Sequence, residues 1–367
     1  MITVLVVVGK LTIGGAERVC RDIGYSGDSS CFQFDYLVFG DEVGAYEREL
    51  SAKGCQIYHW KSPGSNHLRY YRNLVQLIRE KHYDVVHCHT MFNSGIVLRA
   101  AKHCEVPIRI AHSHSIRGPE PRGFVKNLYE KTMRRWILRD ATHKIGCGTA
   151  AGEWLFGKEA FQREGIVLLN GIDLEHFRFD PICRDRLRRD LGWEDAFVIG
   201  HTGHLATVKN QIFLLRLMPE LLKQKPNARL VLLGEGEDRT MLENVVSDLK
   251  LETAVRMPGS VQNVNEYLNA MDVFAFPSLY EGTPLSILEV QANGLPCVIS
   301  DRVPKDVFLT DLLWPLPLEN SARLWIDALL TARRRDPERY LTEMQQSNAD
   351  VHQMLNQIFH IYRGESE

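Results

Sequence analysis

Two glutamates lie at the clearest strand–loop–helix junction of the sequence, PSLYEGTPLSILEVQANGLPCVIS (277–300). Glu281 precedes the expected helix and Glu289 lies inside it, with seven residues between them. Thr283 is the expected N-cap and Pro284 the expected first helical residue. Carboxylates accept hydrogen bonds from hydroxyl groups, so both suit a sugar or a ribose. The alternative is that they only complement the helix dipole.

The same helix start predicts an anion site. The first backbone amides, those of Leu285, Ser286 and Ile287, have no partner in a preceding turn, and such amides suit a diphosphate. Lys209, in GHLATVKNQ (203–211), is a compact cation that can neutralise a departing diphosphate. The alternative for Lys209 is a solvated side chain in front of a capped helix.

Histidines alternate along two expected strands. His87 and His89 end one strand, and His112 and His114 end another. The alternation of a strand points the first pair to one face and the intervening Cys88 to the other. The cluster at 87–89 therefore fits a strand end facing a cleft better than a metal site, and we expect no metal.

A glycine pair follows the first expected strand, in GKLTIGGAER (9–18). Gly14 and Gly15 carry no Cβ, so the backbone can closely approach a phosphate or an acceptor. A tight turn is the alternative. The spacing is not GxGxxG, so a dinucleotide-binding fingerprint is not predicted.

Alternating strands and helices must position these residues, and they predict an α/β protein with doubly wound parallel sheets. The expected strands are 2–8, 34–40, 56–60, 84–89, 108–113, 143–147, 165–170, 197–203, 228–234, 254–259, 273–278 and 296–300. A polar connecting segment, 170–187, separates two such sets. We expect Rossmann-like domains at 1–175 and 176–345, facing each other across a cleft, with a helical end from about 336. Its last part, about 346–363, would pack back on the first domain.

Composition excludes several classes of protein. The 367 residues suggest two domains at roughly 150 residues each. A net charge of −2 lacks the basic excess of a nucleic-acid-binding protein, and no stretch approaches the ~20 apolar residues of a membrane span. The apolar start, MITVLVVVGK, is interpreted as a strand and not as a secretory signal. Eight cysteines without a CxxC pair favour a reducing cytoplasm.

Segment 117–140 combines basic and apolar residues at helical spacing. Its basic residues are Arg117, Arg122, Lys126, Lys131, Arg134, Arg135 and Arg139. Its apolar residues include Phe124, Leu128, Tyr129, Met133, Trp136 and Ile137. A basic amphipathic helix can lie on an anionic bilayer surface. The alternative is a surface helix that buries its apolar stripe in the first domain.

Segment 277–300 resembles the donor-site motif of the retaining glycosyltransferases of family 4. More narrowly, it resembles the branch that builds capsular and other exopolysaccharides. The resemblance covers roughly residues 1–305. It implies the GT-B fold, an active site in the cleft between two Rossmann-like domains, and neither a metal nor another cofactor. It also implies that Glu281 contacts donor-sugar hydroxyls and that Glu289 holds the nucleotide ribose.

The resemblance implies roles for residues of the second domain. Lys209 and the backbone amides of residues 285–287 would stabilise the departing diphosphate. Gly234 and Glu235, in GEG, resemble the nucleotide-side loop, and Val261, in MPGSV, lies in a loop that holds the base by main-chain contacts. His204 departs from the family, which usually has arginine there. Because histidine is charged only part of the time near neutrality, donor binding would be weaker or pH-dependent.

In the first domain, Gly14 and Gly15 are similar to the family's glycine-rich N-terminal loop. A family histidine lies against the donor sugar. In this chain it is His114 or, in the other register, His112.

The sequence thus predicts a retaining, metal-independent glycosyltransferase. Its donor would be a nucleotide diphosphate sugar, most simply UDP-linked. Its acceptor would be a hydroxyl of a growing glycan, lipid-linked or soluble, on the cytoplasmic face of the membrane. The alternatives are a non-catalytic sugar-nucleotide-binding subunit of a glycan assembly complex and a sugar-nucleotide epimerase of the same fold. Nucleic acid is not expected as a partner.

Overall fold

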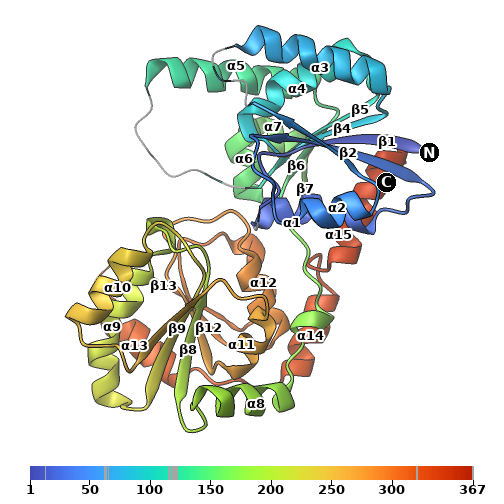
Figure 1. Ribbon diagram of the computed structural model, residues 1–367. Coiled ribbons are helices and arrows are strands. Elements are labelled where there is room, and N and C mark those ends of the chain that lie inside the picture. Colours follow the sequence, from blue (N-terminus) through green and yellow to red (C-terminus); the bar gives the residue numbers. More distant parts are fainter. Residues whose placement is uncertain are drawn as a thin grey trace. The chain divides into compact units, whose positions relative to one another are not determined.

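The computed structural model describes residues 1–12, 14–61, 64, 66–114, 116, 123–319 and 321–365. The chain divides into two compact units. Unit 1 comprises Met1–Gly171 and Val351–Glu367, and unit 2 comprises Ile172–Asp350. The division comes four residues before the expected boundary at 175, and the chain returns to unit 1 at Val351 (Figure 1).

Unit 1 contains a parallel sheet in the order β3-β2-β1-β4-β5-β6-β7. The strands are β1 Ile2–Val7, β2 Phe32–Phe39, β3 Gln56–Trp60, β4 Val85–Cys88, β5 Ile108–Ser113, β6 His143–Gly146 and β7 Gly165–Val167. Most positions of β1, β2, β4 and β5 are buried, because helices cover both faces of a parallel sheet. The chain order and sheet order together are those of a doubly wound fold.

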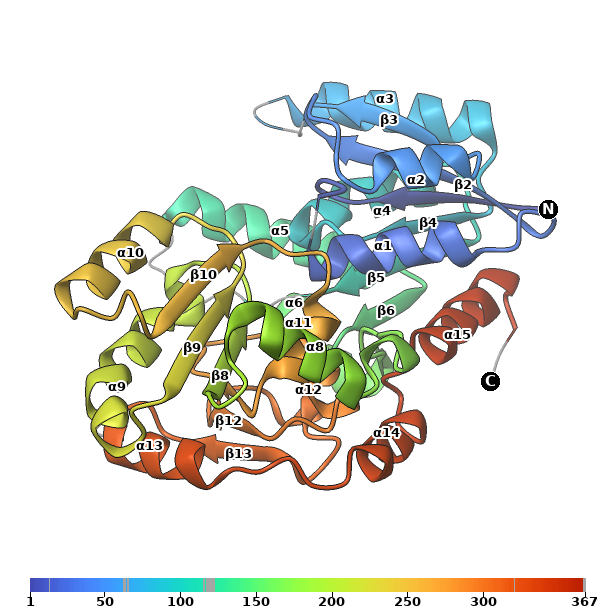
Figure 2. The same cartoon turned by 60° about the horizontal axis from the view of Figure 1, so that its bottom comes forward.

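Two helical layers cover this sheet. The helices are α1 Gly15–Ser26, α2 Glu47–Ala52, α3 His67–Lys81, α4 Ser94–His103, α5 Phe124–Asp140, α6 Thr149–Phe156, α7 Lys158–Glu164 and α15 Val351–Arg363, with the short 3-10 helix η1 Met91–Asn93. Helices α3, α4 and α5 share one core with one face of the sheet, while α1 and α15 share a second core with the other face (Figures 1 and 2).

Unit 2 repeats this plan with the sheet order β10-β9-β8-β11-β12-β13. Its strands are β8 Phe197–Thr202, β9 Ala228–Leu233, β10 Val255–Gly259, β11 Val273–Phe276, β12 Cys297–Ser300 and β13 Leu313–Leu316. Its helices are α8 Pro181–Leu191, α9 Gln211–Gln224, α10 Arg239–Asp248, α11 Val264–Ala270, α12 Leu285–Ala292, α13 Ala322–Thr331 and α14 Pro337–Gln345, with the 3-10 helices η2 Glu175–Phe177, η3 Thr207–Lys209 and η4 Lys305–Val307. Helices α9, α10 and α13 pack on one face, and α8, α11, α12 and α14 on the other.

Both sheets have a topological switch point, where successive strands are added on opposite sides. In unit 1 it lies between β1 and β4, and in unit 2 between β8 and β11. Open α/β sheets bind ligands outside the carboxyl ends of the strands at such points. The loops that follow these four strands are therefore the places to look for chemistry.

Two local predictions were wrong. Pro284, not Thr283, is the N-cap residue of α12, because Pro284 has extended backbone (φ −71°, ψ 111°) and the first helical residue is Leu285. The C-terminal helical stretch is also not continuous. It breaks between α14 and α15, where Asp350 forms a parallel bridge to Ile172.

Candidate functional site

The loops after β8 and β11 meet at the switch point of unit 2. The Leu279 amide donates to the Val208 carbonyl oxygen (2.8 Å), and Asn210 Nδ2 donates to the Pro277 carbonyl oxygen (3.2 Å). Asn210 is the N-cap residue of α9 but has a left-handed backbone (φ 54°), and its side chain makes no capping bond. It joins the two loops instead of capping the helix.

Lys209 and Glu281 form an ion pair across these loops. Lys209 Nζ donates to Glu281 Oε1 at 2.7 Å, and the two side chains are only 18% and 11% exposed. The ammonium also lies 5.2 Å from the centre of the Phe276 ring. The Lys209 ammonium is therefore fixed by its ion pair and largely shielded from solvent. The alternative interpretation, a solvated lysine in front of a helix, does not describe this side chain.

The start of α12 provides part of the expected anion site. The Ile287 amide donates to the Pro284 carbonyl oxygen (3.0 Å), so it is not among the available donors. Leu285 and Ser286 are the first two residues of the helix, and no preceding helical turn supplies an acceptor for their amides. Glu289 lies in the second turn and is 8% exposed. A carboxylate thus lies on each side of this helix start.

The loop after β9 packs closely on the loop after β8. Gly234 has a φ of +137°, and a Cβ there would lie 2.0 Å from the Gly203 carbonyl oxygen. The Leu205 amide donates to the Glu235 carbonyl oxygen (2.8 Å). Only glycine fits at 234, because both the backbone conformation and the close approach exclude a side chain.

The Glu235 side chain forms an ion pair with Arg239, in which Glu235 Oε1 lies 2.7 Å from Arg239 Nη1. Val261 follows β10 and is half-buried against the core of unit 2. The structure therefore places both residues in loops at the carboxyl edge of the sheet.

His204 also lies in a loop at the carboxyl edge of the sheet, the loop after β8, but its side chain is exposed to solvent. Its Nε2 lies 2.7 Å from Glu237 Oε2, with side-chain exposures of 62% and 67%. A backbone hydrogen bond and, to a smaller extent, this pairing lower the pKa of Glu237. No local pattern predicted Glu237 as the partner of His204, because 33 positions separate the two residues.

In unit 1, Gly14 and Gly15 open α1 after β1. Gly14 is the N-cap residue, with extended backbone and no side-chain cap. A Cβ at Gly14 would lie 2.3 Å from Glu17 Oε2, and burial raises the pKa of that carboxyl group. The Glu17 carboxylate thus lies against the glycine loop, where a side chain at position 14 would collide with it.

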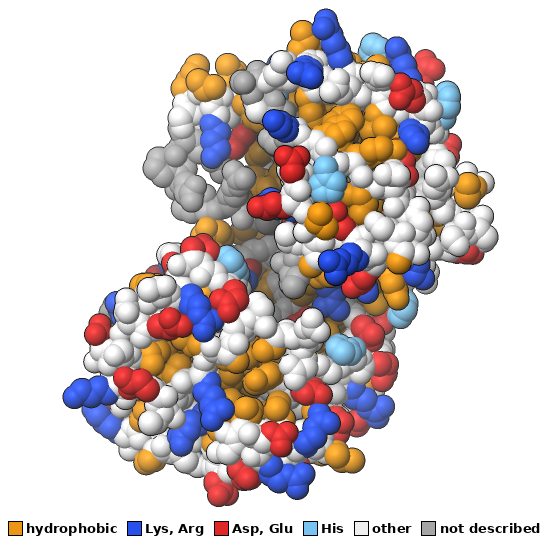
Figure 3. Space-filling view, viewed as in Figure 1, with side chains coloured by type: hydrophobic (Ala, Val, Ile, Leu, Met, Phe, Trp, Pro, Cys, Tyr) orange, Lys and Arg blue, Asp and Glu red, His pale blue; other side chains and the backbone are white. Residues whose placement is uncertain are grey.

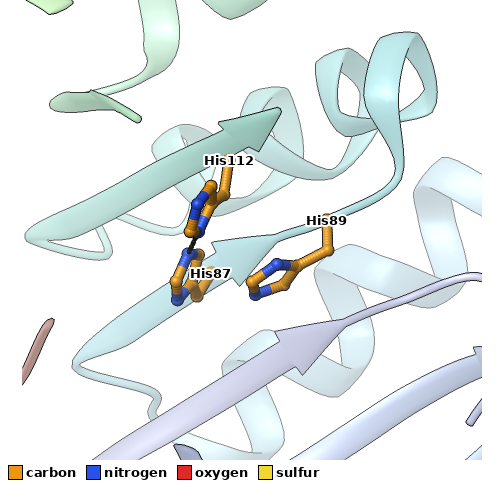
Figure 4. A group of neighbouring side chains, drawn as sticks. All are labelled: His87, His89 and His112. Atoms are coloured by element: carbon orange, nitrogen blue, oxygen red, sulfur yellow. Dashed lines mark hydrogen bonds between the residues drawn. The ribbon is translucent and has the colours of Figure 1, made fainter. Parts of the chain in front are cut away.

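Four imidazoles gather where β4 and β5 end. His87 Nε2 lies 3.2 Å from His112 Nδ1 (Figure 4). His89 Nδ1 lies 2.7 Å from His114 Nε2. Cys88 points to the opposite face, where it packs with the core that includes α3 to α5. The predicted alternation is confirmed, and it brings the two histidine pairs together.

Two further residues hold the ends of this cluster. The Tyr362 hydroxyl from α15 lies 2.7 Å from His87 Nδ1, and His114 Nδ1 donates to Asn170 Oδ1 at 3.2 Å. Neither partner was predicted. Tyr362 is 275 positions from His87, and no local sequence pattern signals such a contact.

Burial favours the uncharged form of all four rings. Burial lowers the pKa of His87, His89 and His112 well below the usual range, and neighbouring imidazoles lower it further. Burial also lowers the pKa of His114 to about 4. Both nitrogens of His114 are hydrogen-bonded, whereas the Nε2 atoms of His89 and His112 have no hydrogen-bond partner among the described residues. The role of His112 or His114 at a donor sugar stays a prediction.

Helix α5 covers the described part of the predicted amphipathic segment. Its second half buries one face, with Met133 and Ile137 in the core, whereas Phe124, Val125 and Leu128 at its start are 82%, 80% and 56% exposed. Figure 3 shows hydrophobic side chains at the surface over the region of α5. Arg117 and Arg122 lie outside the described residues. Among the residues that the structure describes, no helix is long and apolar enough to cross a membrane.

Two family models match the chain. The model for glycosyl transferases group 1 matches residues 184–308, and that for the glycosyl transferase 4-like domain matches residues 14–171. Each match falls within one of the two units, and together they cover the loops described above.

Curated relatives agree with these models. EpsF of Bacillus subtilis (strain 168), which is assigned as a glycosyltransferase, is 33% identical over 99% of this chain and 97% of its own. A UDP-Gal:alpha-D-GlcNAc-diphosphoundecaprenol alpha-1,3-galactosyltransferase of Escherichia coli is 30% identical over 62% of this chain and 60% of its own. CapH of Staphylococcus aureus, a capsular polysaccharide biosynthesis glycosyltransferase, is 22% identical over 83% of each chain.

Solved structures show the same fold. HepE of Anabaena, in complex with UDP-glucose, aligns with a TM-score of 0.81 at 20% identity, over 99% of this chain and 100% of its own. Sucrose-phosphate synthase of Thermosynechococcus elongatus aligns with a TM-score of 0.76 at 16% identity, over 99% of each chain. The chain therefore belongs to the family-4 type of glycosyltransferases with the GT-B fold, in the branch that acts in exopolysaccharide and capsule biosynthesis.

Proposed function

We propose that this glycosyltransferase retains the anomeric configuration of its donor and uses a UDP-linked sugar without a metal ion. The acceptor would be a hydroxyl of a lipid-diphosphate-linked glycan. The observation that carries the proposal is the desolvated Lys209–Glu281 pair at the switch point of unit 2, beside the start of α12. A relative that transfers galactose from UDP-Gal to a diphosphoundecaprenol-linked sugar supports both the donor and the acceptor class.

The residues of unit 2 would divide the work on the donor. Lys209 and the Leu285 and Ser286 amides would stabilise the charge that develops on the departing diphosphate. Glu281 would accept hydrogen bonds from sugar hydroxyls, and Glu289 would accept them from the ribose. Because the leaving-group charge is met by an ammonium and backbone dipoles, transfer would need no divalent cation. The site contains the cation before the donor arrives, so little reorganisation is needed at the moment of reaction.

In the proposed reaction, the acceptor hydroxyl attacks the anomeric carbon from the face that the leaving diphosphate occupies. The bond between the acceptor oxygen and the anomeric carbon forms as the bond to the diphosphate oxygen breaks. The hydroxyl proton passes to the departing diphosphate. The configuration is retained, and no protein nucleophile is needed.

A thermal-shift screen against free nucleotides and nucleotide sugars tests the donor site. We expect UDP and one UDP-sugar to raise the melting temperature equally with magnesium and with EDTA, because a ligand that binds only the folded state stabilises it. A shift that appears only with magnesium would contradict metal independence. Stabilisation without turnover, even with a membrane extract as the acceptor source, would favour the non-catalytic binding subunit.

We further propose that the N-terminal end of α5 lies on an anionic membrane surface. Phe124, Val125 and Leu128 are exposed there, and Lys126 and Lys131 lie on the same helix. Apolar side chains with neighbouring cations suit the headgroup region of an anionic bilayer. In vesicle flotation, the protein should bind vesicles with anionic lipids and not neutral ones. A Phe124→Ser/Leu128→Ser variant should lose this binding, and equal binding by the variant would refute the assignment.

A further inference from the structure

A cavity of about 590 Å³ lies at the amino ends of β8 and β11 in unit 2. Its lining includes Phe197, the first residue of β8, and Asp272, which directly precedes β11. The Lys209–Glu281 pair lies in the loops that follow the carboxyl ends of the same two strands. The cavity is therefore separate from the proposed donor site. Its volume falls in the range of about 300–1,000 Å³ that is usual for small-molecule sites.

Cationic side chains outnumber carboxylates around this cavity. The charged residues of its lining are Arg184, Lys225, Arg333, Arg334, Asp195 and Asp272. One of the two carboxylates is already shared between arginines, because Asp272 Oδ1 lies 2.5 Å from Arg184 Nη2 and Asp272 Oδ2 lies 3.2 Å from Arg188 Nη1. The lining thus has an excess of positive charge, which favours an anionic ligand.

Arg334 is fixed at the cavity wall by uncharged groups. Its Nη1 donates to the carbonyl oxygen and to Oδ1 of Asn293, at 2.5 and 2.8 Å. Its Nη2 donates to the carbonyl oxygens of Leu268 and Met271, at 3.0 and 3.3 Å. The Nε atom is buried and has no hydrogen-bond partner among the described residues. The guanidinium group is therefore held in place by oxygens that do not neutralise its charge.

Arg184 brings a second positive charge close to Arg334. Both guanidinium groups donate to the carbonyl oxygen of Met271, Arg184 at 2.7 Å and Arg334 at 3.3 Å. Burial and, after it, the charge of Arg184 lower the pKa of Arg334 to about 9. Like charges at such short range repel each other, so an anion in the cavity would stabilise both groups.

Two exposed cations complete the lining. Lys225 is the C-cap residue of α9, and Arg333 follows the end of α13. Cations at the end of a helix can simply complement its dipole. This accounts for Arg333 Nη1, which donates to the carbonyl oxygens of Leu330 and Ala332 at 2.7 and 2.6 Å. It does not account for the Lys225 ammonium, which makes no hydrogen bond or ion pair with a described residue.

We propose that this cavity binds a small sugar phosphate. The phosphate dianion would lie among the cations of the lining, because charge-assisted hydrogen bonds from ammonium and guanidinium groups are the strong ones. Sugar hydroxyls would donate to the Asp195 carboxylate and to the Asn227 amide oxygen, since both side chains line the same cavity. Such a ligand would join α8, the end of α9 and the segment after α13. The site uses none of the proposed donor-site residues and does not depend on the proposed function.

Calorimetry of the full chain with glucose 1-phosphate tests the site. We expect one glucose 1-phosphate per chain, bound more tightly than inorganic phosphate, with an affinity that falls as salt is added. Lys225→Gln and Arg333→Gln should each weaken binding about 10-fold, because each removes one charged donor. Lys223→Gln is the matched control and should leave binding unchanged. Lys223 is an exposed lysine of α9 that pairs with Glu220 and does not line the cavity.

A second comparison separates this cavity from the donor site. Lys209→Met should bind glucose 1-phosphate as the wild type does, because Lys209 lies at the other end of the strands. Loss of binding in Lys209→Met with normal binding in Lys225→Gln would place the ligand in the donor site and overturn the proposal. UDP binding in the same preparation reports separately on the proposed function.

Thermal denaturation of the unaltered protein provides an independent measurement. Glucose 1-phosphate should raise the melting temperature, whereas glucose should not, because the phosphate carries the binding. The absence of saturable binding or equally tight binding of inorganic phosphate would overturn the proposal. Wild-type affinity in both Lys225→Gln and Arg333→Gln would overturn it as well.

Discussion

Replacing Lys209 by methionine should separate the electrostatic role of the residue from its packing role. Methionine keeps an unbranched apolar stem against the Phe276 ring but removes the ammonium that lies 2.7 Å from Glu281. If Lys209 stabilises the departing diphosphate, its loss removes one preorganised charge from the transition state. Such a loss costs about 2.7–4 kcal/mol, or about 10²–10³-fold in turnover.

The same change should destabilise unit 2. Removing one partner of a buried ion pair costs about 3–5 kcal/mol, and the 18% and 11% residual exposure of these side chains lowers the estimate to about 2 kcal/mol. For a unit of this size, that corresponds to a fall of about 4–8 °C in melting temperature. The cost arises because Glu281 is left charged, little exposed and without its cation.

The double variant Lys209→Met/Glu281→Gln distinguishes the two effects. It removes both charges, so the melting temperature should largely recover while transfer stays low. Lys223→Met is a matched control. Its ion pair with Glu220 has the same 2.7 Å length, but the side chains are 73% and 57% exposed. The control should change stability by less than about 1 kcal/mol.

Scanning fluorimetry and transfer of radiolabelled sugar to a membrane extract measure the two quantities. Transfer by Lys209→Met within a few-fold of the wild-type rate would refute the role of the cation. A double variant that is no more stable than Lys209→Met would refute the reasoning about the ion pair.

Three further predictions concern unit 2. Glu289→Ala should weaken UDP binding in calorimetry, whereas Glu281→Ala should chiefly lower transfer, and unchanged behaviour of both would contradict the assigned roles. Gly234→Ala should destabilise the unit by about 2 kcal/mol more than Gly192→Ala. Both positions have positive φ, but only position 234 brings a Cβ to 2.0 Å from a carbonyl oxygen, so equal melting temperatures would argue against the close loop contact. Burial lowers the pKa of His201 to about 4, so its neutral form is favoured in the fold and stability is lost as pH falls from about 6.5 toward 4. Between pH 6.5 and 5, urea unfolding of His201→Gln should lose about 2 kcal/mol less than the wild type, and parallel losses would show that His201 does not titrate as inferred.

Much of the fold could be predicted because local patterns determine it. The continuous apolar run of β1 identifies a strand buried on both faces, and the twelve expected strand ranges agree with the structure within a few residues. Strand β13, Leu313–Leu316, was not predicted. The start of α12 was misjudged because Thr283 is a good N-cap by residue type, whereas the backbone of Pro284 is what ends the extended segment. Propensity places such boundaries only approximately.

The candidate site could be predicted only where its residues are close in sequence. Glu281 and Glu289 share one motif, and their position at a helix start follows from the residues between them. The Lys209–Glu281 pair joins residues 72 positions apart, and the His87–Tyr362 contact joins residues 275 apart. Such contacts depend on the order of strands in the sheet and on the return of α15 to unit 1. A single sequence does not specify those features locally.

The most direct test of the proposed function is the product of a single transfer reaction in EDTA. Purified protein would be incubated with a panel of UDP-sugars and a diphosphoundecaprenol-linked acceptor, and the new glycosidic bond examined by nuclear magnetic resonance. We predict that one UDP-sugar gives a lipid-linked product with the anomeric configuration of the donor. A product of inverted configuration, or transfer that requires added magnesium, would contradict the proposed mechanism.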